Sequence, residues 1–286
     1  MARIAFSSLA CPEWPIERVV DAAAQWGYAG VELRSFGTGS TRFACDPAMT
    51  GGHKLRRLFM AAGVEPAGVA TGLALDDPVC PPVVGHLLSK SWACVDEGRS
   101  YVEIAKGLGA PHVRLFGFHV PKVPFQSRRG TLKRIAGRAA RLANACRHHG
   151  VNVLMENGGD FGSAHDLIEI VNAAGHPGVR ACYDIAAGVS AGDDPVQAVR
   201  DMSDALDVVR IRDRKGDNPV ELGTGELPNQ AVVAALARQG FTGWLVYEWE
   251  RAWIDGLASP ELVLPKAAQT LSSWLGAGDA SAHSAA

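Results

Sequence analysis

The chain lacks the cysteine spacing of a disulfide scaffold or a zinc module. Its six cysteines are scattered without a C-x-x-C pair, and a chain of 286 residues does not need disulfides to fold. No uninterrupted apolar stretch reaches the length that spans a membrane, and the N-terminus lacks the apolar segment of a signal peptide. These absences predict reduced thiols and a cytoplasmic protein with no membrane partner.

The chain also lacks an excess of charge of either sign. Its net charge near −2 offers no general attraction to nucleic acid or to acidic membranes. An apolar fraction of 47% with 20% charged residues is typical of a soluble globular enzyme. We therefore expect a small-molecule partner and no nucleic acid, while a homo-oligomer remains compatible with the sequence.

Acidic residues are absent from residues 104–155, and this stretch ends in an apolar run that Glu156 closes. The same placement recurs at Asp184 and Glu248, each at the end of a β-prone run, and Arg210 lies near the end of another. Open α/β sheets and barrels build their active sites at the C-terminal ends of their strands. Four strand-like segments thus each deliver an ionisable group to that end.

Short β-prone runs alternate with segments of helical period, a pattern that predicts a parallel sheet with crossover helices. The expected strands are residues 3–7, 30–34, 65–70, 112–116, 151–156, 179–184, 207–211 and 244–249. Eight such units fit a single (β/α)8 TIM barrel better than two domains. We predict this domain over residues 1–275 and, from its Ala, Ser and Gly content, a disordered tail over 276–286.

Side chains alternate along a strand, so residues two apart share a face. If Glu156, Asp184 and Glu248 point into the barrel, so do Cys182 and Val246, whereas Tyr183 and Tyr247 face the helices. The same rule pairs further residues on a common face: Arg210 with Arg212, His112 with Arg114, and Glu32 with Arg34. The predicted pocket therefore combines acids with arginines.

Glu156 and Glu248 would face each other across the barrel mouth, where they could remove a proton from one face of a sugar carbon and return it to another. Asp184 could complete an oxygen-rich site for a divalent cation. Alternatively, these acids form buried ion pairs with Arg114 and Arg210 and carry no chemistry. Because desolvating several charges at strand ends is costly, the pattern favours a functional site.

Two long loops are expected at residues 71–90 and 212–228, and loops of this length are usually lids or binding loops. The second contains Gly223-Thr224-Gly225. This segment could form an amide nest for an anion, or it could be a simple turn.

Several short motifs follow one another along the chain. They are Phe6-Ser7, Gly27 to Leu33, Val113 to Gly117, Met155-Glu156-Asn157, Tyr183-Asp184, Leu222 to Glu226 and Gly240 to Glu250. In order and spacing they resemble the xylose isomerase-like (AP endonuclease family 2) TIM barrels, in the branch of sugar isomerases, epimerases and dehydratases. The likeness runs over most of the chain.

The resemblance implies a metal held by Glu, Asp, His and Glu from strands five to eight, with the glutamates also acting in acid-base chemistry. Glu156, Asp184 and Glu248 match three of these ligands for Mn, Mg or Zn. On strand seven, however, the usual His-x-Lys-Asp reads as residues 210–213, Arg-Ile-Arg-Asp, and a guanidinium has no lone pair for a metal. Either the three carboxylates and water bind a hard cation, or Arg210 takes its place.

The sequence thus predicts an isomerase or epimerase of a keto sugar or sugar-derived acid, acting through an enediolate and without an organic cofactor. The expected catalytic residues are Glu156, Glu248 and Arg210, and the expected substrate-binding residues are Glu32, Arg114, Asp184 and Arg212. A dehydratase that uses the same carboxylates, or a catalytically silent sugar-binding barrel, remains an alternative. A DNA-repair endonuclease is disfavoured, since the histidines of a zinc cluster and a basic mouth are missing.

Overall fold

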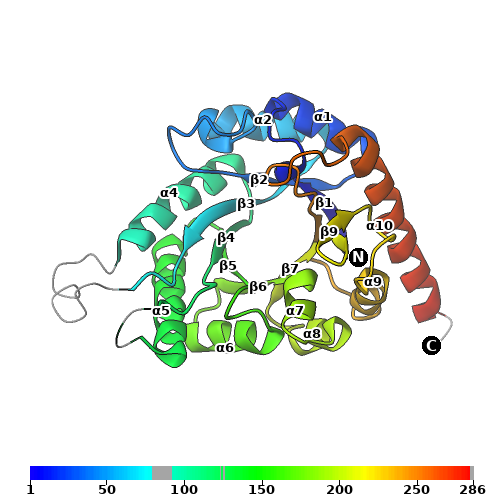
Figure 1. Cartoon of the computed structure of the whole chain (residues 1–286). Coiled ribbons are helices and arrows are strands. Elements are labelled where there is room, and N and C mark those ends of the chain that lie inside the picture. Colours follow the sequence, from blue (N-terminus) through cyan, green and yellow to red (C-terminus); the bar gives the residue numbers. More distant parts are fainter. Residues whose placement is uncertain (79–91, 123, 125, 284–286) are drawn as a thin grey trace.

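Eight parallel strands pair in chain order, and the last closes against the first to form a barrel (Figure 1). The computed structural model describes residues 1–78, 92–122, 124 and 126–283. The barrel strands are β1 (Arg3–Ser7), β2 (Gly30–Arg34), β3 (Glu65–Ala74), β4 (His112–Phe116), β5 (Asn152–Glu156), β6 (Val179–Asp184), β7 (Leu206–Ile211) and β10 (Trp244–Tyr247). The predicted fold class is confirmed, and the strand bounds agree to within a few residues.

Helices surround the barrel on its outside (Figure 1). They are α1 (Ile16–Trp26), α2 (Gly52–Ala62), α4 (Ala93–Leu108), α5 (Arg128–Cys146), α6 (Ala164–Ala174), α7 (Ile185–Ser190), α8 (Pro195–Asp201), α9 (Asn229–Arg238) and α10 (Pro260–His283), with short 3-10 turns η1 (Ser8–Ala10) and η2 (Pro47–Met49). None of the helices among the described residues is both long and apolar enough to cross a membrane. Helix α10 runs through Gly276, so it covers most of the segment for which the composition predicts disorder.

Glycine ends the first two helices where the sequence places it. Gly27 follows α1 with φ 78°, and Gly63 follows α2 with φ 67°, both in the left-handed region that other residues avoid. The amphipathic face of α1 buries Val19, Val20 and Ala23 against the barrel. Local sequence therefore decides both where these helices stop and which side faces inward.

The barrel encloses a small apolar layer of its own, separate from the larger core between strands and helices. Its members are Ala5, Ala67, Leu154, Cys182, Val208, Trp244 and Val246. The predicted inward orientation of Cys182 and Val246 is thereby confirmed. Tyr183 and Tyr247 belong to the outer core, and the Tyr183 hydroxyl donates to Asp193 Oδ2 at 2.9 Å behind the strand.

The expected loop after β7 contains a short antiparallel hairpin, β8 (Asp213–Lys215) with β9 (Asn218–Val220). Asp213 Oδ2 accepts hydrogen bonds from the amides of Gly223 at 2.9 Å and Gly225 at 3.0 Å. The glycine turn is thus an amide nest, and its anion is the chain's own carboxylate. In the other expected loop, β3 continues to Ala74, and residues 79–91 lie outside the described residues.

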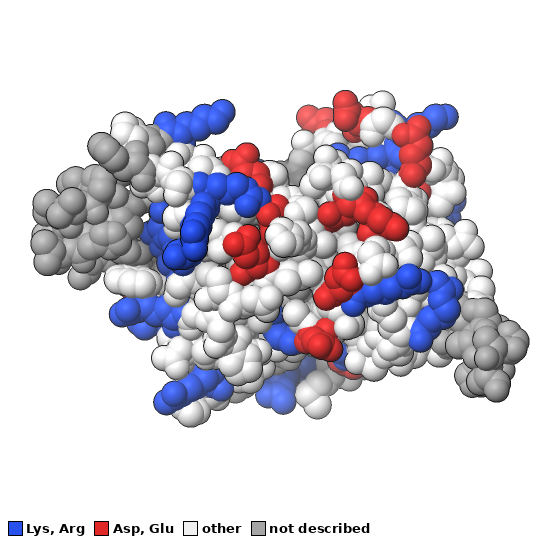
Figure 2. All heavy atoms as spheres, turned by 90° about the horizontal axis from the view of Figure 1, so that it is seen from below, with Lys and Arg blue, Asp and Glu red and all other residues white. Residues whose placement is uncertain are grey.

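One side of the molecule is seen in Figure 2, where the view is turned by 90° from that of Figure 1. Lysine and arginine side chains are interspersed there with aspartate and glutamate. This face therefore presents no broad patch of a single charge.

Candidate active site

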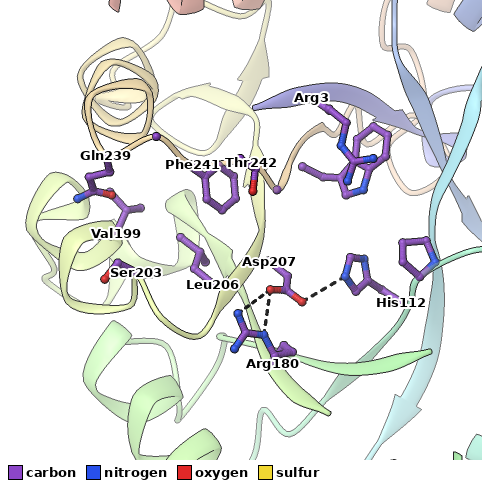
Figure 3. A pocket seen from close by; sticks show the side chains of 14 residues that line it. Arg3, His112, Arg180, Val199, Ser203, Leu206, Asp207, Gln239, Phe241 and Thr242 are labelled. Atoms are coloured by element: carbon purple, nitrogen blue, oxygen red, sulfur yellow. Dashed lines mark hydrogen bonds and ion pairs between the residues drawn. The ribbon is translucent and has the colours of Figure 1, made fainter. Parts of the chain in front are cut away.

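The barrel has a cavity at each end. The cavity at the N-terminal ends of the strands includes Arg3, His112, Arg180, Asp207 and Trp244 in its lining (Figure 3). The cavity at the C-terminal ends has a volume of about 370 Å³. Its lining includes most of the predicted site residues, which are Arg114, Glu156, Asp184, Arg210, Arg212 and Glu248.

The N-terminal cavity is built around a paired carboxylate. Asp207 Oδ1 accepts from Arg180 Nε at 2.9 Å, and Asp207 Oδ2 lies 3.2 Å from His112 Nε2 (Figure 3). Burial alone would raise the pKa of Asp207, but its bonds to His112 and Arg180 outweigh burial and lower it. TIM-barrel enzymes place their active sites at the opposite, C-terminal end of the strands. We therefore interpret His112, Arg180 and Asp207 as a structural ion-pair network.

At the C-terminal end, Arg114 and Arg210 join three glutamates from separate strands. Arg114 Nε lies 3.2 Å from Glu32 Oε1, and its Nη1 contacts Glu156 Oε2. Arg210 Nη1 donates to Glu32 Oε2 at 2.8 Å, its Nη2 contacts Glu248 Oε2, and its Nε lies 3.8 Å from Glu156 Oε2. Glu156 and Glu248, predicted to face each other, therefore share one guanidinium between them.

Arg212 links the remaining acids at the rim. Its Nη2 lies 2.8 Å from Asp184 Oδ2, and its Nη1 donates to Glu248 Oε1 at 2.8 Å and to Glu250 Oε1 at 3.3 Å. The other Asp184 oxygen, Oδ1, accepts from the Ala187 amide at 3.0 Å and caps α7. Every predicted carboxylate is thus engaged by at least one arginine.

The positions of Glu156 and Asp184 are held by Asn157, the residue after β5. Its Oδ1 accepts from the Asp184 amide at 2.6 Å, and its Nδ2 donates to the Asp184 carbonyl at 3.1 Å. The same amide group donates to the Gly162 carbonyl at 2.8 Å. One buried side chain therefore fixes the ends of β5 and β6 relative to each other, and with them the two acids.

The electrostatics of the site favour the charged form of Glu32. Burial would raise the pKa of Glu32, yet the neighbouring Arg114 and Arg210 outweigh it and lower that pKa. Burial likewise opposes the charge of Arg114, but Glu156 and Glu32 raise its pKa above the ordinary value. Burial, followed by the Glu156 charge, raises the pKa of the Cys182 thiol well above its usual value, so this cysteine is a poor nucleophile.

The carboxylates predicted as metal ligands, Glu156, Asp184 and Glu248, do not form a metal site in this arrangement. The Arg210 guanidinium lies against Glu248 and near Glu156, while Arg212 engages Asp184 and the other Glu248 oxygen. A guanidinium offers no lone pair and repels a cation. Among the described residues, no three His, Cys, Asp or Glu side chains are arranged to hold a metal ion.

The structure brings all seven predicted site residues into one network. Glu32 lies within it as a partner of Arg114 and Arg210. Sequence reasoning missed three further groups in the cavity lining: Arg34 as a site residue, Glu250 and Trp253. The parity rule could have found Glu250, which lies two residues after Glu248, whereas the sequence around Trp253 gives no such signal.

Comparisons with known proteins agree with this architecture. The xylose isomerase-like TIM barrel family matches residues 20–274. A search of curated protein sequences finds no match. Among solved structures, L-ribulose 3-epimerase is 17% identical with a TM-score of 0.81, and the alignment covers 100% of this chain and 98% of that one.

Two further structures have the same fold. The probable 3-DHS dehydratase AsbF from Bacillus anthracis is 14% identical with a TM-score of 0.74, over 94% of this chain and 98% of that one. The IolI protein, solved with a bound zinc atom, is 17% identical with a TM-score of 0.73, over 98% of each chain. At these identities the likeness establishes the fold.

Proposed function

The chain belongs to the xylose isomerase-like TIM barrel family, and from this premise we propose that it is an isomerase or epimerase of a keto sugar or sugar-derived acid. One observation carries the proposal. Glu156 and Glu248 approach the same guanidinium, that of Arg210, at the wall of one cavity. Two potential proton carriers thus flank a fixed positive charge at the end of the barrel where TIM-barrel enzymes place their active sites.

The proposed reaction is a proton transfer next to a carbonyl. One of the two glutamates removes the proton on the carbon beside the carbonyl, and the bonding electrons move onto the carbonyl oxygen to give an enediolate. In an epimerisation the other glutamate, in its protonated form, returns a proton to the opposite face of that carbon. In an isomerisation the former carbonyl carbon is protonated instead, and the proton of the adjacent hydroxyl moves to the former carbonyl oxygen, so that the carbonyl is transferred to the neighbouring carbon. Exchange with water then restores the starting protonation of both groups.

In this proposal Arg210 stabilises the enediolate. The substrate's oxygens replace a carboxylate at the guanidinium, which frees that carboxylate to act as a base and places two N–H donors on the developing oxyanion. Arg212, which also binds Glu248, lies at the rim, where substrate oxygens can replace this carboxylate at its guanidinium in the same way. Because the cavity walls are buried, these charge interactions are stronger than they would be in water.

A dehydratase is the second candidate, since a probable dehydratase shares this fold at a TM-score of 0.74. If the same enediolate expels a β-hydroxyl group before it is reprotonated, the result is an elimination. Mass spectrometry distinguishes the two outcomes, because the product of an elimination is lighter than the substrate by one water molecule.

The test uses Glu156→Gln and Glu248→Gln with a panel of keto sugars and sugar acids, including solvent-deuterium incorporation as a readout. Each substitution is expected to lower turnover by about 10²-fold or more while substrate affinity changes little. Glu103→Gln, on the exposed surface of α4, is the matched control and should leave turnover unchanged. A wild-type protein that binds a panel member but exchanges no deuterium would contradict the enzyme and favour a binding protein.

A further inference from the structure

Arg34, at the end of β2, is a cavity arginine without a carboxylate partner among the described residues. It is only 8% exposed and lines the same cavity as Glu156 and Glu248. Its Nη1 donates to the Thr71 carbonyl, while its Nε is buried without a hydrogen-bond partner. Leaving such a donor unpaired is unfavourable, and an acceptor at this position in the cavity would satisfy it.

Arg34 differs from the other arginines of this cavity in its ion pairs. Arg114, Arg210 and Arg212 each lie within ion-pair distance of at least two carboxylates. For Arg34, burial and then the positive charge of Arg114 lower the pKa to about 10, so the group remains charged at neutral pH. A buried cation beside another cation gains from a nearby anion, and the residues that the structure describes supply none in direct contact with Arg34.

A second arginine, Arg42, lies on the same aromatic surface. The Arg34 guanidinium carbon is 4.9 Å from the ring centre of Phe36 and 5.8 Å from that of Trp253. The corresponding distances for the exposed Arg42 are 4.7 Å and 4.8 Å. The two cations therefore lie around one pair of rings, and no carboxylate pairs with either within the described part of the chain.

The loop that carries these groups is anchored. Asp46 accepts from the Ser35 hydroxyl at 2.8 Å and from the Phe36 amide at 2.8 Å. Phe36 packs edge-on against Phe43, with ring centres 4.9 Å apart. Arg34 and Arg42 are thus presented by a braced segment beside the cavity, which lowers the entropic cost of binding.

We propose that Arg34, assisted by Arg42, binds a carboxylate or phosphate group of the ligand, so that the cavity accepts anionic sugar derivatives in preference to neutral sugars. The inference rests on the proposed function, because it takes the cavity to be a sugar site. The anion would lie on the Arg34 side of the cavity, and the reacting carbons would lie toward Arg210. Arg34 is then a specificity-determining residue rather than a proton carrier.

The test measures binding of small probes rather than turnover. Acetate, inorganic phosphate and neutral D-fructose are titrated into wild-type protein by calorimetry at constant ionic strength. We expect at least one anion to bind about tenfold or more tightly than D-fructose, and Arg34→Gln or Arg42→Gln to weaken it by about tenfold. Whether acetate or phosphate binds distinguishes the two kinds of ligand.

Arg141→Gln is the matched control, because Arg141 is an exposed arginine stacked on Trp92 at 4.2 Å on another part of the molecule. Two further variants keep the test valid if Arg34→Gln folds poorly. Arg34→Lys keeps the charge and should retain part of the affinity, and Arg42→Gln alters only an exposed side chain. Absence of anion binding, or binding equal in all variants, would overturn the inference. Failure of the proposed function would instead appear as anion binding with no proton exchange on any sugar.

Discussion

Arg210 on β7 and Glu32 on β2 meet inside the barrel, with Arg210 Nη1 2.8 Å from Glu32 Oε2. The two strands are not neighbours in the sheet. Both side chains are almost completely buried, at 1% and 3% exposure. This ion pair belongs to a network in which each buried charge is compensated by its partners, and the first prediction follows from that compensation.

Arg210→Met is expected to lower the free energy of unfolding by about 3–5 kcal/mol, because it leaves buried carboxylates without a counter-charge. Urea denaturation measures this loss. Adding Glu32→Gln to Arg210→Met should restore part of the stability. Arg18→Met removes the exposed pair with Glu261 and serves as the control, with an expected loss of about 1 kcal/mol or less. Equal losses for the two arginines would contradict the structural argument.

The second prediction concerns metal. Wild-type protein dialysed against EDTA should keep its activity, since guanidinium groups engage the carboxylates that a cation would need. Arg210→His should acquire measurable affinity for Mn²⁺ or Zn²⁺ in a calorimetric titration, because the substitution supplies an imidazole ligand and removes the positive charge of the guanidinium. Arg210→Gln, which removes the charge without adding an imidazole, is the control. Activity lost on chelation and restored by metal would refute this prediction.

The third prediction concerns the loop after β7. Asp213→Asn is expected to lower the free energy of unfolding by about 1–3 kcal/mol. Asp213 accepts from the Gly223 and Gly225 amides at Oδ2 and from the Leu227 amide at Oδ1, whereas an asparagine side chain has only one acceptor oxygen. Hydrogen exchange of these amides should accelerate as well. Asp217→Asn, at an exposed position of the same hairpin, should change neither quantity. Unchanged exchange in Asp213→Asn would show that the nest is held by other contacts.

The fourth prediction is a pH dependence at the N-terminal end of the barrel. The pKa of Asp207 is lowered from its ordinary value of 3.8, so its ion pairs stabilise the fold fully above that pH. The stability they contribute is lost as the pH falls through the lower, folded-state pKa. The difference in unfolding free energy between wild type and Asp207→Asn should therefore narrow as the pH falls below about pH 4.

Urea titrations between pH 7 and pH 3 test this prediction, with Asp21→Asn at an exposed position of α1 as the control. A difference that widens toward acid pH would mean that Asp207 is not stabilised as a carboxylate.

Strand positions and side-chain orientation were predictable because both follow from local rules. A period of two along β6 places Cys182 and Asp184 on one face and Tyr183 on the other, whatever the rest of the chain does. The placement of Glu156, Asp184 and Glu248 at the ends of β-prone runs identified the strands that carry the acids, and the resemblance to a known family implied their roles. The roles assigned to these acids stay predictions until the variants are measured.

Other features depend on contacts between distant segments. Nothing in the sequence near Arg34 shows that no described carboxylate pairs with it, because its contacts are set by β3 and by the segment around Trp253. The nest of Asp213 likewise required knowing that the turn folds back onto β8. Helix α10 continues beyond Gly276 to His283, and local composition does not show this because it leaves out the preceding helical turns that a helix can extend.

The apolar layer inside the barrel, with Leu154, Cys182 and Trp244 among its members, separates the two charged ends. Within the described ranges the ion pairs on its two sides share no partner, so their effects on stability should simply add. Asp207→Asn combined with Arg210→Met is expected to lose the sum of the two separate losses, within about 0.5 kcal/mol. The two rims of the barrel are then energetically independent, and the residues of the candidate active site can change without disturbing the ion pairs at the other rim.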